Sequence, residues 1–463
     1  MKKIGILVMF LIALISKAQE KPNIVYINID DLGWTDLACY GSTYYETPNI
    51  DRLMTQGIKF TDAYASASNC APSRAGLMSG QYSPRYGIYT VGTSERGQSK
   101  DRKLIPVRNK TTLPDSIVTV AEVLKKSGYI TASMGKWHIG DDPRTQGFDV
   151  NVGGNHAGHP KRYFSPYKNK NIEDGPQGEY LTDRLTDEGI RFIRNNKDRP
   201  FFLYMTYYTV HTPLQGKEYL IEKYKKKSGS NYHNHATYAA MVEAMDSNVG
   251  RLIHTLEELG LTQNTLIIFT SDNGGVYAVS KQFPLKYGKG SYYEGGTRVP
   301  LIIRWDGKIK PNTISKTPVI NLDFYPTILE ITKTVVEKNH TLDGVSLTPI
   351  LFKEKKIEKR PIFWHFPIYL EARRKAKKLS GRDILFRTRP GSAMRYGKWK
   401  LHQYFEDGAV ELYNLENDIS ETRDISKDKP RIAAKLLKML NAWRKEVHAP
   451  IPAKLNPEYS HLK

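Results

Sequence analysis

Residues 23–33 read NIVYINIDDLG, an apolar and β-branched run that ends abruptly in two carboxylates, Asp30 and Asp31. Three later segments share this design and also end in polar residues: 129–140 (YITASMGKWHIG), 201–213 (FFLYMTYYTVHTP) and 264–275 (NTLIIFTSDNGG). Apolar runs with little alternation of polarity are typical of strands buried on both faces, as in parallel sheets. The four runs therefore predict the centre of a large sheet.

Helical patterns fall between these predicted strands. They cover 116–128, 179–196 and 236–260, and the first and last of them close on a glycine, a common helix stop. Strands that alternate with helices predict an α/β fold with a large, mostly parallel sheet flanked by helices. Ligands of such sheets bind at the carboxyl ends of the strands, so we expect the polar clusters that end the runs to meet at one edge.

The character of the chain changes after about Leu351. A basic stretch, 371–383 (EARRKAKKLSGRD), is followed by short strand-like segments and tight turns over 392–418 and by a helical pattern over 430–448. We therefore predict a main domain over residues 19–350 and a smaller C-terminal α+β subdomain with an antiparallel sheet over residues 351–463.

The N-terminus has the pattern of a secretory signal. Lys2 and Lys3 precede the apolar run 4–15 (IGILVMFLIALI), and small residues surround a plausible cleavage site near Ala18. This pattern predicts a signal peptide over residues 1–18. The run is short for a membrane span and no cysteine follows it, which disfavours a membrane anchor or a lipoprotein. We expect an exported protein, periplasmic or secreted, without stable membrane insertion.

The chain is strongly basic, with a formal net charge of +21. An exported basic protein can meet nucleic acid, anionic lipid or a polyanionic substrate. The sequence contains no helix-turn-helix, zinc-finger or RNA-binding motif, so nucleic acid is not an expected partner. A sulfated or uronic-acid polysaccharide suits an exported protein better.

Two pairs of oxygen-bearing residues end predicted strands. Asp30 and Asp31 follow the first run, and Asp272 and Asn273 follow the last. Oxygen-only ligation suits Ca²⁺ or Mg²⁺, whereas Zn²⁺ favours histidine or cysteine. One such pair is weak evidence, but two pairs at equivalent strand ends favour a metal site.

Basic and imidazole side chains follow the other predicted strands. Lys136 and His138 are two residues apart, so on an extended chain both would face the same side. His211 precedes a Thr-Pro pair, and Lys289 stands in a glycine-rich stretch. Taken one at a time, these residues favour the ordinary interpretation of packed histidines and solvated lysines over a role in a site.

Cys70 and Cys39 are the two cysteines of the chain. A disulfide between them is one possibility, although we favour a small buried thiol for Cys39. Pro72 fits the first turn of a helix, so Cys70 would lie at a helix N-terminus, where anions are stabilised, and Arg74 adds a cation. The residues alone leave a buried structural thiol and an activated nucleophile about equally open for Cys70.

The segment CAPSR (70–74) matches the Cys-x-Pro-Ser-Arg motif of type I, formylglycine-dependent sulfatases, and GKWHIG (135–140) matches the second motif of that family. The resemblance extends through PNIVYINIDDLG, HTP, FTSDNGG, KGSYYEGGTRVP and ELYNLENDISE, and so spans nearly the whole mature chain. The chain is similar to exported bacterial polysaccharide sulfatases. The resemblance implies an alkaline-phosphatase-like fold, a catalytic domain over 19–350 and hydrolysis of sulfate esters.

The resemblance also implies a different chemical identity for Cys70. In the family, a formylglycine-generating enzyme oxidises the matching cysteine to Cα-formylglycine, whose hydrate is a geminal diol. One hydroxyl attacks sulfur and the other helps to expel sulfate. The resemblance further implies a Ca²⁺ ion held by Asp30, Asp31, Asp272, Asn273 and the modified Cys70.

The same resemblance implies roles for the remaining polar residues. Arg74 would hold the diol, and Lys136 and Lys289 would bind sulfate oxygens and stabilise their charge. His211 would act as the general acid for the leaving sugar oxygen, and His138 would orient the diol or act as a base in sulfate release.

Two other functions are compatible with this sequence. One is a phosphodiesterase or phosphonate monoester hydrolase on the same fold, because phosphate resembles sulfate in shape. The other is a noncatalytic relative that binds glycans through its basic surface, which the complete set of core residues disfavours.

The sugar itself is expected to contact variable loops. Candidate residues lie in the segments 153–164 and 372–391, whose basic side chains would suit uronates or further sulfates. These candidates are His156, His159, Arg162, Arg382 and Arg387.

Overall fold

The computed structural model describes residues 21–336, 339–371 and 385–460. The predicted signal peptide, residues 1–18, and the predicted substrate residue Arg382 lie outside the described residues. Within the described ranges, no helix is long and apolar enough to cross a membrane.

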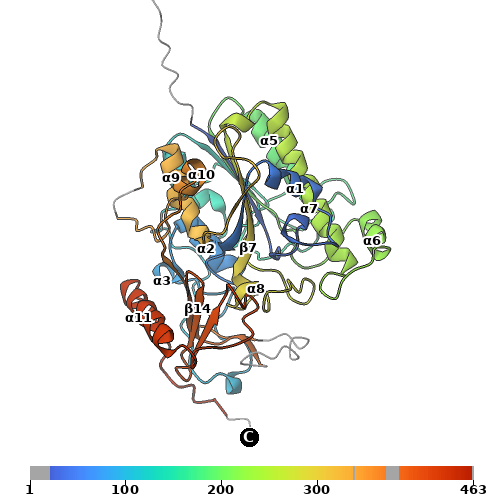
Figure 1. Ribbon diagram of the computed structural model, residues 1–463. Coiled ribbons are helices and arrows are strands. Elements are labelled where there is room, and N and C mark those ends of the chain that lie inside the picture. Colours follow the sequence, from blue (N-terminus) through green and yellow to red (C-terminus); the bar gives the residue numbers. More distant parts are fainter. Residues whose placement is uncertain (1–20, 337–338, 372–384, 461–463) are drawn as a thin grey trace, which may run out of the picture.

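A nine-stranded sheet forms the centre of the larger part of the molecule (Figure 1), in the order β4-β3-β5-β1-β6-β7-β2-β8, with β9 also paired to β2. β7 is antiparallel to both β6 and β2, and the other pairs are parallel. The mostly parallel sheet that the apolar runs predict is thus confirmed. The strands are β1 Asn23–Ile29, β2 Ile58–Tyr64, β3 Ile130–Gly135, β4 Val150–Val152, β5 Phe201–Thr206, β6 Thr265–Ser271, β7 Arg298–Arg304, β8 Thr313–Ser315 and β9 Val319–Ile320.

Helices cover both faces of this sheet (Figure 1). Side chains of β1 alternate between the two faces, as strand geometry requires: Val25 and Ile27 pack in one apolar cluster, whereas Ile24 and Tyr26 pack in the other. The first cluster includes residues of α1 Pro48–Thr55, α5 Leu181–Asn195, α6 Glu218–Lys225 and α7 Ala236–Glu258. The second includes residues of α2 Cys70–Ser79, α3 Ser83–Tyr86, α4 Val120–Lys126, α9 Phe324–Thr332 and α10 Thr348–Lys353.

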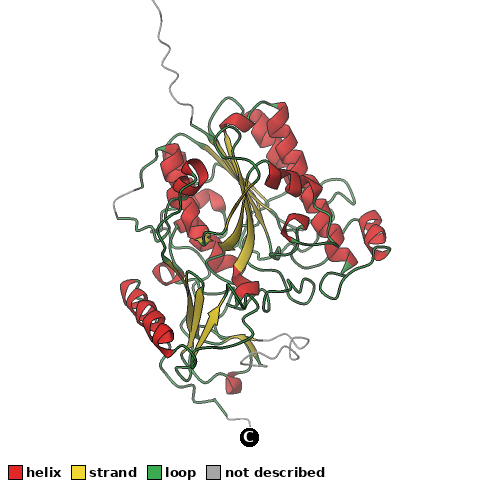
Figure 2. Cartoon of the chain, viewed as in Figure 1, coloured by secondary structure: helices red, strands yellow, loops and turns green. Residues whose placement is uncertain are grey.

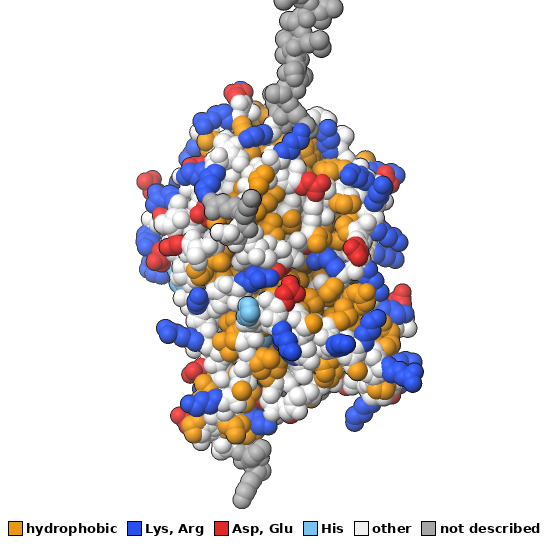
Figure 3. All heavy atoms as spheres, turned by 90° about the vertical axis from the view of Figure 1, so that its left-hand side faces the viewer, with side chains coloured by type: hydrophobic (Ala, Val, Ile, Leu, Met, Phe, Trp, Pro, Cys, Tyr) orange, Lys and Arg blue, Asp and Glu red, His pale blue; other side chains and the backbone are white. Residues whose placement is uncertain are grey.

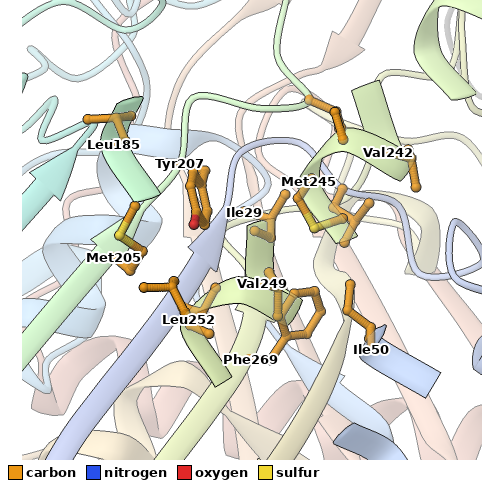
Figure 4. Close-up of a cluster of buried hydrophobic side chains, with 14 of the residues drawn as sticks. Ile29, Ile50, Leu185, Met205, Tyr207, Val242, Met245, Val249, Leu252 and Phe269 are labelled. Carbon is orange, nitrogen blue, oxygen red and sulfur yellow. The ribbon is translucent and has the colours of Figure 1, made fainter. Parts of the chain in front are cut away.

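The long helix α7 shows how the sheet is covered. Met245, Val249 and Leu252 of this helix lie over Ile29 and Phe269 of the adjacent strands β1 and β6 (Figure 4). All five side chains are fully buried. This packing holds the carboxyl ends of β1 and β6 in a fixed position.

Helix boundaries follow local capping rather than apolar periodicity alone. The helical pattern predicted over 116–128 forms a helix only from Val120, because Thr119 and Glu122 make a reciprocal capping box at its start. α2 begins at Cys70 with Pro72 in its first turn, as predicted, and ends at Gly80 in a left-handed conformation.

A second, smaller sheet lies below the first in the view of Figure 2, and it is antiparallel with the order β10-β13-β14-β15. Residues of α11, Pro430–Glu446, pack with it in a third apolar cluster. The predicted C-terminal α+β part is confirmed, whereas the domain boundary at residue 350 stays a prediction. The strands are β10 Pro361–Phe366, β13 Gly391–Tyr396, β14 Trp399–Tyr404 and β15 Val410–Asn414; a separate pair is β11 Leu370–Glu371 with β12 Phe386–Thr388.

Candidate active site

Polar residues lie together at the carboxyl ends of four strands, as the topology predicts. Asp30 and Asp31 follow β1, Lys136 follows β3, Asp272 follows β6, and the segment after β5 leads to His211. The backbone N–H of Asp31 donates to Asp272 Oδ1 over 3.2 Å, which joins the first and last of these clusters directly.

Cys70, the first residue of α2, is buried against this edge of the sheet. Its Sγ lies 3.0 Å from the Nζ of Lys289 and 3.8 Å from Asp31 Oδ1. Both cysteines are free, so the structure contains no disulfide between Cys39 and Cys70. Burial raises the pKa of the Cys70 thiol to about 12, against the attraction of Lys136 and Lys289. A protonated thiol is a poor nucleophile, so this environment does not favour catalysis by an unmodified cysteine.

Three cations balance three buried carboxylates in the site. Lys136 Nζ donates to both oxygens of Asp30, at 2.9 and 2.7 Å. Lys289 Nζ lies 2.8 Å from Asp31 Oδ2, and the Nε of Arg74 donates to Asp272 Oδ2 over 2.8 Å. Arg74 also donates to the carbonyl of Lys136 over 2.7 Å, so its guanidinium ties α2 to the end of β3.

The oxygen atoms of this cluster fit a hard divalent cation. Ligand atoms of Asp30, Asp31, Cys70 and His211 all lie within 4.8 Å of one another. Asn273 Oδ1 is buried and has no hydrogen-bond partner among the described residues, while its Nδ2 donates to Asp31 Oδ1 over 2.8 Å. A buried carbonyl oxygen without a donor is costly unless a cation or water binds it. The donor set suits Ca²⁺ or Mg²⁺.

The two aspartates after β1 have opposite electrostatic environments. Burial raises the pKa of Asp30 above its usual range, although Lys136 opposes this effect. Burial also acts on Asp31, but Lys289 and His211 outweigh it and hold the pKa of Asp31 below its usual range. Of these two aspartates, Asp31 is therefore the one that keeps its negative charge more firmly.

His138 reaches the site by a route that the sequence pattern did not indicate. The strand ends at Gly135, and His138 has a positive φ of 68°, so the backbone is not extended at His138. The His138 N–H donates to the carbonyl of Asn155, and a Cβ on Gly158 would lie only 2.5 Å from the His138 ring. Burial, together with Lys136, lowers the pKa of His138.

His211 faces Asp31, with its Nε2 3.5 Å from Asp31 Oδ2. Its Nδ1 lies 2.6 Å from the carbonyl oxygen of Thr212, which can only accept, so Nδ1 carries a proton. In the neutral ring, Nε2 is therefore the nitrogen with the lone pair. Burial lowers the pKa of His211 to about 3, against the attraction of Asp31.

The predicted sugar-contacting residues occupy different positions. The ring of His159 stacks on that of His211 at a centroid distance of 6.0 Å, and the ring of His156 meets that of His138 edge-on at 6.5 Å. Arg162 is exposed. The segment 153–164 thus lies beside both histidines of the site.

Arg387 supports the backbone of the Lys289 loop. Its guanidinium donates to the carbonyl of Lys289 and to the carbonyl of Glu371, each over 3.0 Å. The next residue, Thr388, donates to the carbonyl of Gly290. Two residues of β12 in the C-terminal part therefore hold the loop that carries Lys289.

A buried ion network also supports the segment around Lys289. Lys400 of β14 lies 2.8 Å from Glu294, which is in the short helix α8 Glu294–Thr297, and 3.4 Å from Glu421. Glu421 also accepts from the backbone N–H of Glu294 over 2.6 Å, and its carbonyl accepts from Lys286 over 2.9 Å. The side chains of Lys400, Glu294 and Glu421 are fully buried.

The sequence contained a signal for Glu294 but none for its partner. Glu294 stands within KGSYYEGGTRVP, a stretch that carries part of the family resemblance. Lys400 stands in the run KWKLHQY, two residues after the exposed Lys398, and nothing in that pattern marks it as buried.

Comparison with known proteins identifies the family. Residues 22–334 match the family model described as Sulfatase. The chain belongs to the sulfatase family. This sulfatase is thus a sulfuric ester hydrolase, and its residues 286–446 match a second model, described as N-sulphoglucosamine sulphohydrolase, C-terminal.

Named relatives of this sulfatase include bacterial and human enzymes. It is 35% identical to a protein named Sulfatase from Formosa agariphila, over 94% of this chain and 90% of that protein. It is 30% identical to human N-acetylgalactosamine-6-sulfatase, over 76% of this chain and 69% of that protein. The crystal structure of Ps i-CgsB in complex with k-i-k-neocarrahexaose has a TM-score of 0.75 at 33% identity and covers 92% of this chain and 93% of that chain.

Proposed function

We propose that this sulfatase hydrolyses sulfate esters of a sulfated polysaccharide or oligosaccharide, with Ca²⁺ and a formylglycine derived from Cys70. The observation that carries the proposal is the meeting of Cys70, Asp30, Asp31 and His211 within 4.8 Å at the carboxyl edge of a sulfatase sheet. Maturation of Cys70 by a formylglycine-generating enzyme and export of the protein, to the periplasm or outside the cell, are part of the same proposal.

The charge of the chain supports a polyanionic substrate. Lys and Arg side chains are spread over much of the face shown in Figure 3, in keeping with the net charge of +21. A positive field of this kind raises the local concentration of an anionic chain around the enzyme. The names of the relatives, an N-acetylgalactosamine-6-sulfatase and a complex with a neocarrahexaose, agree with a sulfated sugar.

Two groups would supply chemistry that the side chains lack. Formylglycine would provide the geminal diol that attacks sulfur and later releases sulfate, and Ca²⁺ would provide Lewis-acid stabilisation of charge on the reacting oxygens. Asp30, Asp31, Asp272 and Asn273 would hold the cation.

The chain's own residues position the substrate and move the proton. Lys136 and Lys289 are proposed to bind sulfate oxygens, since both ammonium groups already point into the anionic cluster. Arg74, fixed by Asp272, orients the group at position 70. His138, whose ring feels the charges of Lys136, Arg74 and Lys289, is proposed to orient this group or to take up its proton.

His211 is proposed as the general acid for the leaving alcohol. Because Thr212 retains the Nδ1 proton, only Nε2 can exchange a proton with the substrate. A bound sulfate brings negative charge beside the ring and raises the pKa of His211. His156, His159, Arg162 and Arg387 are proposed to contact the sugar. Arg387 is also proposed to position the loop of Lys289, to whose carbonyl it donates.

The reaction class is tested by comparing matched sulfate and phosphate esters of the same alcohols, followed by a panel of defined sulfated oligosaccharides. We expect a higher kcat/KM for sulfate esters and the highest value for one member of the panel. Faster turnover of the phosphate esters would instead support a phosphomonoester or phosphodiester hydrolase.

Removal of the metal should lower both the activity and the thermal stability of the enzyme. We expect EGTA to lower kcat by about a thousandfold, because Lewis-acid stabilisation contributes several kcal/mol, and Ca²⁺ to restore it. Ca²⁺ should also raise the unfolding temperature, since a ligand at 100 times its Kd stabilises the native state by about 2.7 kcal/mol.

The variant Asn273→Ala should weaken both effects of Ca²⁺, because it removes the buried oxygen that has no donor. Asn264→Ala, just before the opposite end of β6, is the matched control. If neither the unfolding temperature nor kcat of the wild-type enzyme changes on addition of EGTA or Ca²⁺, the metal site is contradicted.

A further inference from the structure

Two aromatic rings stack on each other at the surface of this sulfatase. Phe283 and Tyr232 are 56% and 39% exposed, and their ring centroids lie 4.3 Å apart with an interplanar angle of 10°. Large apolar side chains are usually exposed singly. In the described ranges, Tyr232 and Phe283 differ from the other exposed large apolar residues because their aromatic rings contact each other.

The pair lies at the edge of the sheet that carries the active site. Phe283 belongs to the segment between the end of β6 and Lys289, and Tyr232 belongs to the connection that enters α7. α7 leads into β6 in the opposite direction, so its start lies at the carboxyl edge of the sheet. The rings therefore belong to two loops that border the site.

Hydrogen bonds connect the pair to the catalytic loop. The side chain of Gln282, next to Phe283, donates to the carbonyl of Gly275 over 3.1 Å and accepts from the N–H of Trp34 over 3.2 Å. The same Gly275 carbonyl accepts from the backbone N–H of Lys289 over 2.8 Å. One carbonyl group thus links the base of the aromatic pair to the loop of Lys289.

The surroundings of the rings favour a sugar as their partner. The faces of aromatic rings carry negative charge density and attract the weakly positive C–H groups of a pyranose ring. Lys281, whose Nζ donates to the carbonyl of Asn231 over 2.8 Å, places a cation next to the residue that precedes Tyr232, where it would attract an anionic glycan. Even fully covered, two aromatic side chains bury only about 150–250 Å² each, well short of the roughly 800 Å² per partner of a stable protein interface.

We propose that Tyr232 and Phe283 bind a sugar ring of the substrate chain, distinct from the sugar that bears the reacting sulfate. This inference rests on the proposed function and adds a site that favours chains over monosaccharides. The contacts of these two exposed rings with a further sugar would make the enzyme bind a polymer more tightly than a monosaccharide.

The test is the double variant Tyr232→Ala/Phe283→Ala, assayed on the best oligosaccharide of the panel and on para-nitrophenyl sulfate. We expect KM for the oligosaccharide to rise about tenfold, the equivalent of 1.4 kcal/mol, with kcat unchanged. KM for the small sulfate should not change. Tyr219→Ala, a 68% exposed aromatic on α6, is the matched control, and Phe283→Tyr should keep the wild-type KM.

Several outcomes would overturn the inference. One is an unchanged KM for the oligosaccharide, and another is an equal rise of KM for the small sulfate. A third is a dimer that the wild-type protein forms in sedimentation velocity and the double variant does not, which would assign the rings to self-association. Calorimetric binding of the oligosaccharides to the Cys70→Ala protein separates this result from the reaction class. If the double variant weakens binding in the Cys70→Ala background, but the protein that keeps Cys70 does not hydrolyse sulfate esters, only the proposed function fails. If no oligosaccharide binds, the sugar site fails.

Discussion

Cys70→Ala is expected to abolish turnover of sulfate esters, with kcat lowered by about 10⁴- to 10⁶-fold, the loss that follows removal of a covalent nucleophile. The fold should survive, because Cys70 is the first residue of α2 and alanine keeps its Cβ in the same place. Stopped assays at high enzyme concentration, with circular dichroism as a check of folding, measure this effect.

The chemical identity of residue 70 is measured by mass. Trypsin releases residues 60–74 as one peptide, because Lys59 precedes it and Arg74 ends it. In active enzyme this peptide should carry an aldehyde in place of the thiol, and activity should rise with the aldehyde fraction when the formylglycine-generating enzyme is co-expressed. Cys70→Ser should accept sulfate once and stop, because serine lacks the second hydroxyl that expels it.

The second cysteine provides a matched control. Cys39 is free and half-buried and lies outside the cluster around Asp31, so Cys39→Ser should retain nearly all activity. Full activity from protein whose 60–74 peptide holds an unmodified thiol would contradict the proposed chemistry, and would make the thiol itself the reactive group.

Lys400→Met is expected to lower the free energy of unfolding by about 3 kcal/mol, the lower end of the range for breaking a buried ion pair. Its ammonium group lies between two fully buried carboxylates, Glu294 and Glu421. Although burial opposes it, Lys400 and Arg298 hold the pKa of Glu294 below its usual range, so this carboxylate is charged in the native state. Without Lys400, Glu421 loses its nearest full cation.

The effect on catalysis should accompany the effect on stability. Glu294 and Glu421 support the loop of Lys289, so kcat of the folded Lys400→Met fraction should fall while Lys400→Arg keeps part of it. Urea denaturation gives the stability, and active-site titration combined with kcat gives the activity per folded molecule.

Lys398→Met is the matched control, because Lys398 precedes β14, is 47% exposed and pairs with Glu416, which is 63% exposed. An exposed pair contributes less than about 1 kcal/mol, so this variant should unfold close to the wild type. Replacing Glu421 with glutamine in the Lys400→Met background should recover part of the loss. If the two lysine variants are equally stable, the buried network does not support the fold.

Local chemistry in the sequence was sufficient for the central strands and for the place of the site. The apolar run before Asp30 predicted a buried strand, and Pro72 predicted a helix that starts near Cys70; both are confirmed. These features depend on residues close together in the chain. The meeting of strand ends followed from one topological rule, which holds for any open α/β sheet.

Only the tertiary structure decided the support of the site. His138 enters it through a left-handed turn, and Arg387, predicted to contact sugar, donates to the carbonyl of Lys289. Lys400 is buried while Lys398 is exposed, although the two lysines stand in the same short run. Burial of a charge depends on carboxylates about 20 and 100 residues away that bring compensating hydrogen bonds, and no local pattern records that pairing.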